Sequence, residues 1–259
     1  MASAGSDFVS PMSGASLFCR FAFPPNSLGY CGPSDPGLLK ELMTGGTAAI
    51  QEVTHVIPAF AGAWPYLELI AMCSDRDPLD PKVVEAYWLG GPLLEQVDLL
   101  TMGNSMTERF RHRAGWDWQA VSDALNAGGR PTHSFHVFCI YPWVGLLQSG
   151  IVNQALDVLD RCRIRWGEVV GETGDRLLVN SQPLAWDGER LSLSVGRVEA
   201  VLPPFDKGLI EVGDLVAMHW DYVCQRITPS QHRYLRRYHD LHLSIANRAR
   251  SELGSRMER

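Results

Sequence analysis

Two stretches decide the fold of this chain: residues 161–180, RCRIRWGEVVGETGDRLLVN, and residues 212–219, VGDLVAMH. In the first, short runs of strand-forming residues flank a glycine turn, and in the second a Gly-Asp turn leads into an apolar strand, a pattern typical of short β-strands. Cys162 stands at the start of the first expected strand and His219 at the end of the last. We expect residues 161–227 to form a small OB-like β-barrel of five short strands.

Turn and cap signals extend this prediction in both directions. Asp187-Gly188 favours a β-hairpin, because both residues tolerate a positive φ. Leu191 to Val201 alternates as a single strand would. Thr228-Pro-Ser-Gln231 is a capping box, which predicts a helix over residues 228–252 that packs on the barrel. The apolar stripe of this helix consists of Leu235, Tyr238, Leu241 and Ile245.

The chain before the barrel has a different pattern. We expect a disordered tail over residues 1–16 and an all-helical domain over residues 17–160. Helix starts are predicted at Asp35-Pro36 and Asp80-Pro81, and a helix end at Gly90-Gly91. The prolines and glycines of residues 18–36 favour a constrained loop there. The fold class is therefore α+β, with a helical domain, a small barrel and a C-terminal helix.

Composition narrows the possible functions. A net charge of −6 gives no basic surface for nucleic acid, and no apolar run is long enough for a membrane span. The N-terminus has no signal-peptide pattern, so we expect a cytoplasmic protein whose six cysteines are thiols. No CxxC pair, phosphate-binding loop, dinucleotide fingerprint or serine-hydrolase elbow is present in the sequence.

The helical domain contains three residues suited to metal binding. Cys31 lies in a Tyr-Cys-Gly-Pro turn, where a thiol can act as a ligand or nucleophile or can simply be a small buried residue. His133 and His136 are three residues apart at an expected helix start, so both can face one ion. A hydrogen-bonded core histidine is the alternative interpretation for His136.

The barrel resembles the hydrogenase maturation chaperones of the HypC/HupF type. The resemblance rests on three segments in the same order: Cys162 to Gly167, Gly174-Asp175 with the strand that follows, and Val212-Gly-Asp-Leu-Val-Ala-Met-His219 before a capped helix. It covers residues 161–240. The whole chain also resembles an uncharacterised bacterial family with a Leu-Gly-Tyr-Cys-Gly-Pro loop.

The resemblance implies a protein that carries iron, possibly bearing cyanide and carbon monoxide, toward the large subunit of a [NiFe]-hydrogenase or another maturation protein. It assigns Cys162 as the iron ligand and places His219 close to it. Arg163 and Arg165 flank Cys162, and arginines that face the site would donate hydrogen bonds to cyanide. Two alternatives remain open: an iron-dependent enzyme with its site between the two domains, and a docking module without a metal.

Overall fold

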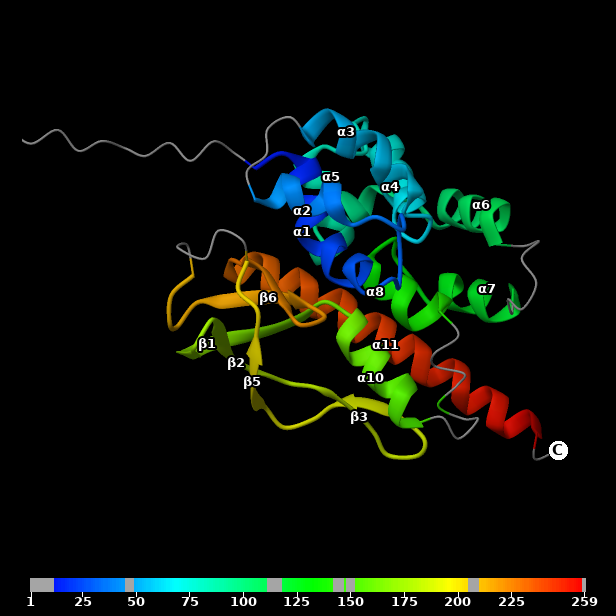
Figure 1. The fold of residues 1–259 in the computed structure, drawn as a ribbon. Coiled ribbons are helices and arrows are strands. Elements are labelled where there is room, and N and C mark those ends of the chain that lie inside the picture. Colours follow the sequence, from blue (N-terminus) through cyan, green and yellow to red (C-terminus); the bar gives the residue numbers. More distant parts are fainter. Residues whose placement is uncertain are drawn as a thin grey trace, which may run out of the picture.

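The computed structural model describes residues 12–44, 49–110, 118–141, 147, 152–204 and 210–257. It has an α+β fold, as the sequence predicts. Helices of the N-terminal half gather on one side of the molecule, and the strands lie on the other (Figure 1). The C-terminal helix runs alongside both parts.

Most helices belong to the N-terminal half. They are α1 (Gly14–Ser27), α2 (Gly37–Met43), α3 (Ala49–Val56), η1 (Ile57–Ala59), α4 (Trp64–Ser74), α5 (Pro81–Leu89), η2 (Pro92–Gln96), α6 (Leu99–Phe110), α7 (Trp118–Asn126), α8 (His133–Phe135), the π-helical turn η3 (His136–Ile140) and α10 (Val152–Cys162). One large apolar core joins these helices to the inner face of the sheet.

The first helix corrects two of the sequence predictions. Residues 14–16 are helical rather than part of a disordered tail, and the helix continues to Ser27 through the segment predicted to be a loop. Pro24 and Pro25 fall in its last turn. The apolar face of α1, which includes Phe18 and Phe21, is fully buried, and this burial outweighs the cost of two prolines inside a helix. Only the part from Leu28 onward forms the constrained loop.

The predicted helix caps are largely confirmed. The Asp80 carboxylate accepts a hydrogen bond from the backbone N–H of Lys82, and α5 ends at Gly90, whose φ is 84°. Asp35 also caps a backbone N–H, that of Gly37, although α2 begins at Gly37 rather than at Pro36. These local signals act through backbone groups that lack an intrahelical partner, which explains why sequence alone reveals them.

The strands form two antiparallel sheets. They are β1 (Arg165–Thr173), β2 (Arg176–Ser181), β3 (Leu184–Trp186), β4 (Leu191–Leu193), β5 (Arg197–Val201), β6 (Leu215–His219) and β7 (Tyr222–Arg226). The larger sheet has the order β5-β2-β1-β6-β7, and β3 pairs with β4. A single bridge between Leu202 and Tyr222 joins the two edges of the larger sheet. The described strands thus make a sheet with linked edges rather than a closed barrel.

Two further predictions about the β part are wrong. Cys162 is the last residue of α10 and does not lie on the first strand, which begins at Arg165. Residues 191–201 form two strands in different sheets, because the chain leaves β4 at Ser194 and pairs again with β2 only from Arg197. The alternation of apolar and polar residues predicts which side chains face a core, but it does not predict to which sheet the strand belongs.

The C-terminal helix α11 (Pro229–Met257) is confirmed with its capping box. The Thr228 hydroxyl accepts from the backbone N–H of Gln231, whose side chain accepts from the backbone N–H of Thr228. Its apolar stripe packs on α5, α7, α8 and η3 as well as on β4. It therefore connects the helical part to the β part instead of covering the sheet alone.

Among the described residues no single helix is both long enough and apolar enough to cross a membrane, although the bent pair Glu52–Ala59 and Trp64–Ser74 together meet those limits of length and composition.

Candidate metal centre between the helices and the sheet

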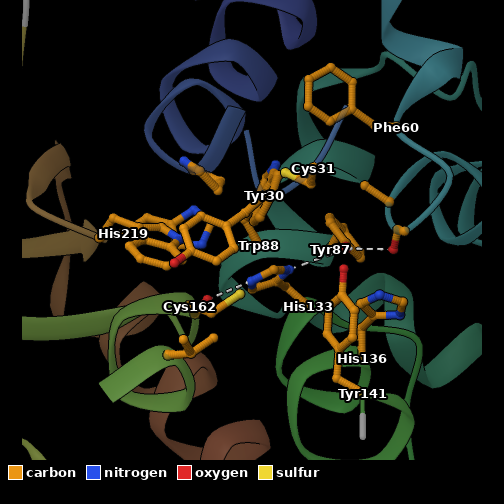
Figure 2. Close-up of a pocket in the computed structure, with 15 residues that line it drawn as sticks. Tyr30, Cys31, Phe60, Tyr87, Trp88, His133, His136, Tyr141, Cys162 and His219 are labelled. Atoms are coloured by element: carbon orange, nitrogen blue, oxygen red, sulfur yellow. Dashed lines mark hydrogen bonds between the residues drawn. The ribbon is translucent and has the colours of Figure 1, made fainter. Parts of the chain in front are cut away.

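A pocket of about 100 Å3 lies at the junction of the helical part, α10 and the end of β6 (Figure 2). It is lined by aromatic, cysteine and histidine side chains. His133, His136, Cys31, Cys162 and His219 all belong to its wall. The sequence-based candidates from both halves of the chain therefore share one pocket.

Three of these residues bring potential metal ligands close together. One ring nitrogen from each of His133 and His219 and the Sγ of Cys162 all lie within 4.8 Å of one another. In a tetrahedral zinc-like site the corresponding N–S separation is roughly 3.5 Å, so side-chain shifts of about 1 Å would bring the three into ligation distance. The resemblance places Cys162 near His219, and the structure adds His133 to them.

His219 is oriented by a hydrogen bond to the first helix. Its Nδ1–H donates to the carbonyl of Phe21 at 2.6 Å, which leaves the lone pair on Nε2. That Nε2 is buried and has no hydrogen-bond partner among the described residues. A buried, unpartnered ring nitrogen whose opposite nitrogen donates to a carbonyl is the arrangement found in metal-ligating histidines.

His133 is held at both ring nitrogens. Its Nε2 lies 2.7 Å from the carbonyl of Cys162 and must donate the proton, while its Nδ1 lies 3.3 Å from the hydroxyl of Tyr87. Tyr87 has a second acceptor, the carbonyl of Gly62 at 3.2 Å. A metal ion bound by His133 would have to displace one of these two contacts, and Gly62 gives the Tyr87 hydroxyl an alternative acceptor.

Burial sets the protonation states of the three groups. It raises the pKa of the Cys162 thiol well above its usual range, with a smaller contribution from the nearby Cys31. It lowers the pKa of His133 to about 4 and that of His219 well below 6.5, and the neighbouring His133 lowers the latter further. At neutral pH the site thus holds two neutral imidazoles and a protonated thiol that a metal ion would have to deprotonate.

The loop after α1 forms the outer wall. Cys31 lines the pocket but is not one of the three clustered ligands, and burial raises the pKa of its thiol to about 12. The loop is fixed by the Asn26 side chain, which donates to the carbonyls of Cys31 and Pro33 at 2.7 Å each. Tyr30, half exposed, stacks on Trp220 with ring centroids 4.3 Å apart, so these two rings separate the pocket from solvent.

His136 belongs to the opposite wall and is engaged elsewhere. Its Nδ1 lies 3.2 Å from the Tyr66 hydroxyl, and a Cβ at Gly62 would lie only 2.9 Å from its Nε2. It begins the π-helical turn η3, a feature that often accompanies functional sites. The structure thus separates the two histidines of the predicted pair, with His133 facing Cys162 and His219.

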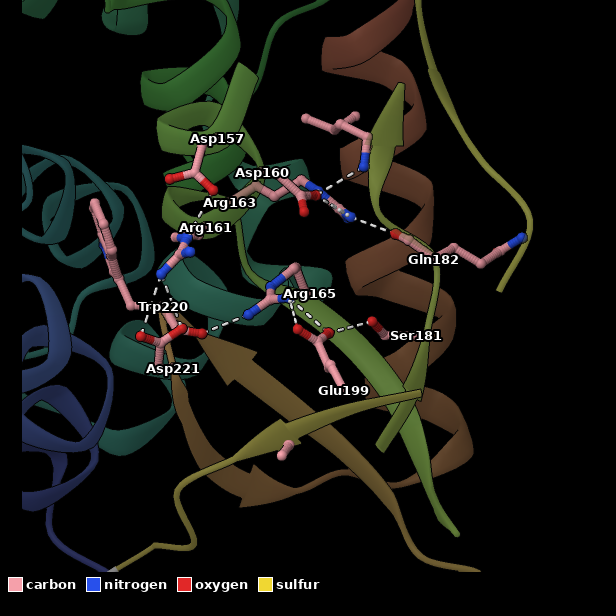
Figure 3. Close-up of polar contacts among 12 residues, drawn as sticks. Asp157, Asp160, Arg161, Arg163, Arg165, Ser181, Gln182, Glu199, Trp220 and Asp221 are labelled. Carbon is pink, nitrogen blue, oxygen red and sulfur yellow. Dashed lines mark hydrogen bonds and ion pairs between the residues drawn. The ribbon is translucent and has the colours of Figure 1, made fainter. Parts of the chain in front are cut away.

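Arg163 and Arg165 do not line the pocket. The Arg163 guanidinium is fully buried against Asp160 and donates to the carbonyl of Gln182 (Figure 3). Arg165 donates to both carboxylate oxygens of Glu199 at 2.6 Å. Most of their donors are therefore occupied within the β part, although Arg165 Nε has no hydrogen-bond partner among the described residues. The expectation that the two arginines face a metal-bound ligand has no support in this geometry.

Arg165 instead supports the turn that carries His219. Its second terminal nitrogen donates to the carbonyl of Trp220, the residue after His219 (Figure 3). Trp220 has a φ of 53°, an unusual value for a residue with a large side chain. The carbonyl of Arg161 accepts a hydrogen bond from the Trp220 N–H, and the Arg161 side chain forms an ion pair with Asp221. Two arginines thus stabilise a strained turn, which fixes the position of His219.

The donor set is suitable for a transition metal. One thiolate and two imidazoles suit zinc, copper or iron, and three protein ligands leave a coordination position open toward the pocket. Sequence reasoning missed the aromatic wall, which includes Tyr87, Trp88 and Trp220. No local motif marks these residues, because they come together only when α5, α8 and the β6–β7 turn pack.

Fold and pocket thus define an α+β protein with a candidate metal centre between its helices and its sheet. The chain belongs to the DUF6390 family, a family of unknown function whose profile matches residues 10–253. No curated protein and no solved structure matches the chain.

Proposed function

We propose that this protein is an accessory protein for metal-centre assembly that holds a transition metal, iron in this proposal, at His133, Cys162 and His219. The observation that carries the proposal is the cluster of three potential ligand atoms within 4.8 Å of one another, together with the buried Nε2 of His219, which has no hydrogen-bond partner among the described residues. A soft thiolate beside two imidazoles is a suitable donor set for iron with strong-field ligands.

The resemblance to HypC/HupF-type chaperones suggests which protein would receive the metal centre. In it, the centre passes to a [NiFe]-hydrogenase large subunit or another maturation protein, and the linked-edge sheet is a partly open form of the OB-like barrel. An incompletely ligated metal suits a carrier, because a partner can supply the remaining ligand. The exposed side chains of Leu28 and Tyr30 beside the pocket offer such a partner an apolar contact.

The decisive experiment is infrared spectroscopy on protein purified without oxygen from cells that assemble a [NiFe]-hydrogenase. We expect cyanide and carbonyl stretching bands that disappear in Cys162→Ala. The matched control is Cys73→Ala, because Cys73 is half-buried, as Cys162 is, and lies on α4 outside the pocket wall. Absence of the bands from the wild-type protein, in cells with active hydrogenase, would contradict the iron-carrier proposal.

A second candidate function is a metal-dependent enzyme. It is favoured by the further polar side chains in the same pocket wall, those of His136, Tyr87 and Tyr141 (Figure 2). Iron bound in stoichiometric amounts but without cyanide or carbonyl bands would favour this candidate. A docking module without a metal is the third possibility, and it requires partner binding that is insensitive to substitution of Cys162 and His219.

A further inference from the structure

Two hydrogen-bond donors of the pocket wall have no partner. The indole Nε1–H groups of Trp88 and Trp220 are buried, and neither finds an acceptor among the described residues. Both side chains line the pocket, Trp88 from α5 and Trp220 from the turn after β6. Buried indole N–H groups are usually satisfied, so an unpaired one indicates an absent water or ligand that accepts a hydrogen bond.

The same tryptophans adjoin the metal ligands. The Trp88 ring centroid lies 4.7 Å from that of His133 and 5.7 Å from that of His219. Trp220 follows His219 directly in the chain. The unpaired acceptor site of His219 Nε2 and the two unpaired donors therefore belong to one small region of the wall.

Charge balance selects the kind of ligand. A divalent ion with one thiolate and two neutral imidazoles has a net charge of +1. None of the described residues that line the pocket is Lys, Arg, Asp or Glu, so the wall does not neutralise this charge. A buried net charge is costly, and a monoanion at the open coordination position would remove it.

We propose that the pocket binds a small monoanion, with one end on the metal ion and the other accepting hydrogen bonds from the indole N–H groups of Trp88 and Trp220. This inference rests on the proposed metal site. The pocket volume of about 100 Å3 suits an anion of a few heavy atoms. Its apolar wall without cationic side chains disfavours dianions such as phosphate and sulfate.

The test uses the full chain loaded with cobalt(II), a spectroscopic probe for the thiolate–imidazole site, and azide as the anion. We expect azide to change the visible absorption of the cobalt protein and to have no detectable binding to the metal-free protein. In the metal-loaded wild-type protein, two of the eight tryptophan indole N–H resonances should move when azide is added. This last measurement needs no variant.

Variants then assign the donors. Trp88→Phe and Trp220→Phe should each weaken azide binding about tenfold, because each removes one hydrogen bond to a charged acceptor. The cobalt affinity of each variant is measured in the same titration, and azide binding is compared at full cobalt occupancy, so that a change in the metal site is separated from the loss of the hydrogen bond. Trp118→Phe on α7, which lies outside the pocket wall, is the matched control and should bind azide as the wild-type protein does.

The possible failures are distinguishable. If cobalt does not bind, the proposed metal site is wrong, and the anion proposal fails with it. If cobalt binds but azide changes neither the absorption nor any indole resonance, the metal site stands and the anion proposal is overturned. If azide binds with unmoved indole resonances, or equally well in both tryptophan variants, the assignment of the donors is wrong.

Discussion

The imidazole of His219 donates to the carbonyl of Phe21 across 198 residues of sequence, at 2.6 Å. This hydrogen bond joins the end of β6 to the middle of α1, and it turns Nε2 toward His133 and Cys162. The candidate metal centre thus depends on the docking of the sheet against the first helix, and neither part of the chain forms it alone.

The first prediction concerns the ligands themselves. Cys162→Ala and His219→Ala should each weaken cobalt(II) or zinc binding by at least about a hundredfold, because each removes one of three protein ligands. The measurement is a competition titration with a chromophoric chelator. Cys73→Ala should bind as the wild-type protein does, since this half-buried cysteine lies on α4 outside the pocket wall. Wild-type affinity in both ligand variants would exclude the proposed centre.

The second prediction concerns pH. Burial raises the pKa of the Cys162 thiol, so a metal ion must displace one proton from it. The pKa of His133 is lowered to about 4 and that of His219 also lies well below 6.5, so neither imidazole carries an extra proton at pH 6. The apparent metal affinity should therefore rise about tenfold per pH unit between roughly pH 6 and 8.

The slope of this pH dependence is the useful observable. Solvent-exposed histidines would add their own protons below pH 6.5 and make the dependence steeper there. A single slope of one across the whole range agrees with two neutral buried imidazoles. A slope that approaches three at pH 6 would show that both histidines are protonated in the metal-free protein. Isothermal titration in buffers of different ionisation enthalpy counts the released protons directly.

The sequence reveals those features of the site and fold that depend on residues close together in the chain, and it does not reveal those that depend on contacts between distant segments. The capping boxes and the glycine helix end act within one turn of helix, and they were predicted from the sequence and confirmed. The pairing of Cys162 with His219 came from the resemblance. His133 was a candidate only as a partner of His136, and its place beside Cys162 depends on contacts between α8 and α10 that no local pattern encodes.

Arg163 and Arg165 show that an inaccurate helix boundary also limits prediction from the sequence. Their spacing beside Cys162 suggested donors that face a metal-bound ligand, an interpretation that assumed one strand through all three residues. The helix instead continues to Cys162, and both guanidinium groups are occupied by Asp160 and Glu199 inside the β part. A boundary that shifts by three residues thus changes the expected direction of every neighbouring side chain.

The third prediction tests the support of the His219 turn. Arg165 connects Glu199 to the carbonyl of Trp220, and Arg165→Lys keeps the charge but loses the two-pronged geometry. We expect about tenfold weaker metal binding in Arg165→Lys and in Glu199→Gln, because the turn that positions His219 becomes looser.

Arg161→Gln is the informative control for this prediction. It removes the partly exposed ion pair with Asp221 but keeps the backbone hydrogen bond to Trp220, so its effect on metal affinity should be small. Rotation of the imidazole can be followed in the NMR signals of His219. Equal metal affinity in Arg165→Lys and the wild-type protein, with unchanged His219 signals, would show that the strained turn holds its shape without Arg165.

The fourth prediction concerns acid stability and a histidine outside the metal site. Burial lowers the pKa of His242 to about 3, with smaller contributions from His239 and Arg130. His242 accepts a hydrogen bond from the Arg130 N–H at 3.1 Å and lies 2.7 Å from the hydroxyl of Ser134, so α11 is attached to the start of α8 by a neutral imidazole. This attachment holds the helix that carries His133 in place.

The sign of the pH effect follows from the lowered pKa. Between about pH 6.5 and 3 the unfolded chain binds a proton at His242 and the folded protein does not, so the free energy of unfolding falls as the pH falls through this window. From pH 7 to pH 5 this one group should account for a loss of about 2 kcal/mol. The free energy of unfolding, measured in urea at both pH values, should therefore fall less between pH 7 and pH 5 in His242→Gln than in the wild-type protein. The difference should be that amount, even if the variant is less stable at pH 7. An unaltered pH dependence in His242→Gln would mean that the imidazole is protonated in the folded protein, and the hydrogen bond from Arg130 to its Nε2 would then not exist.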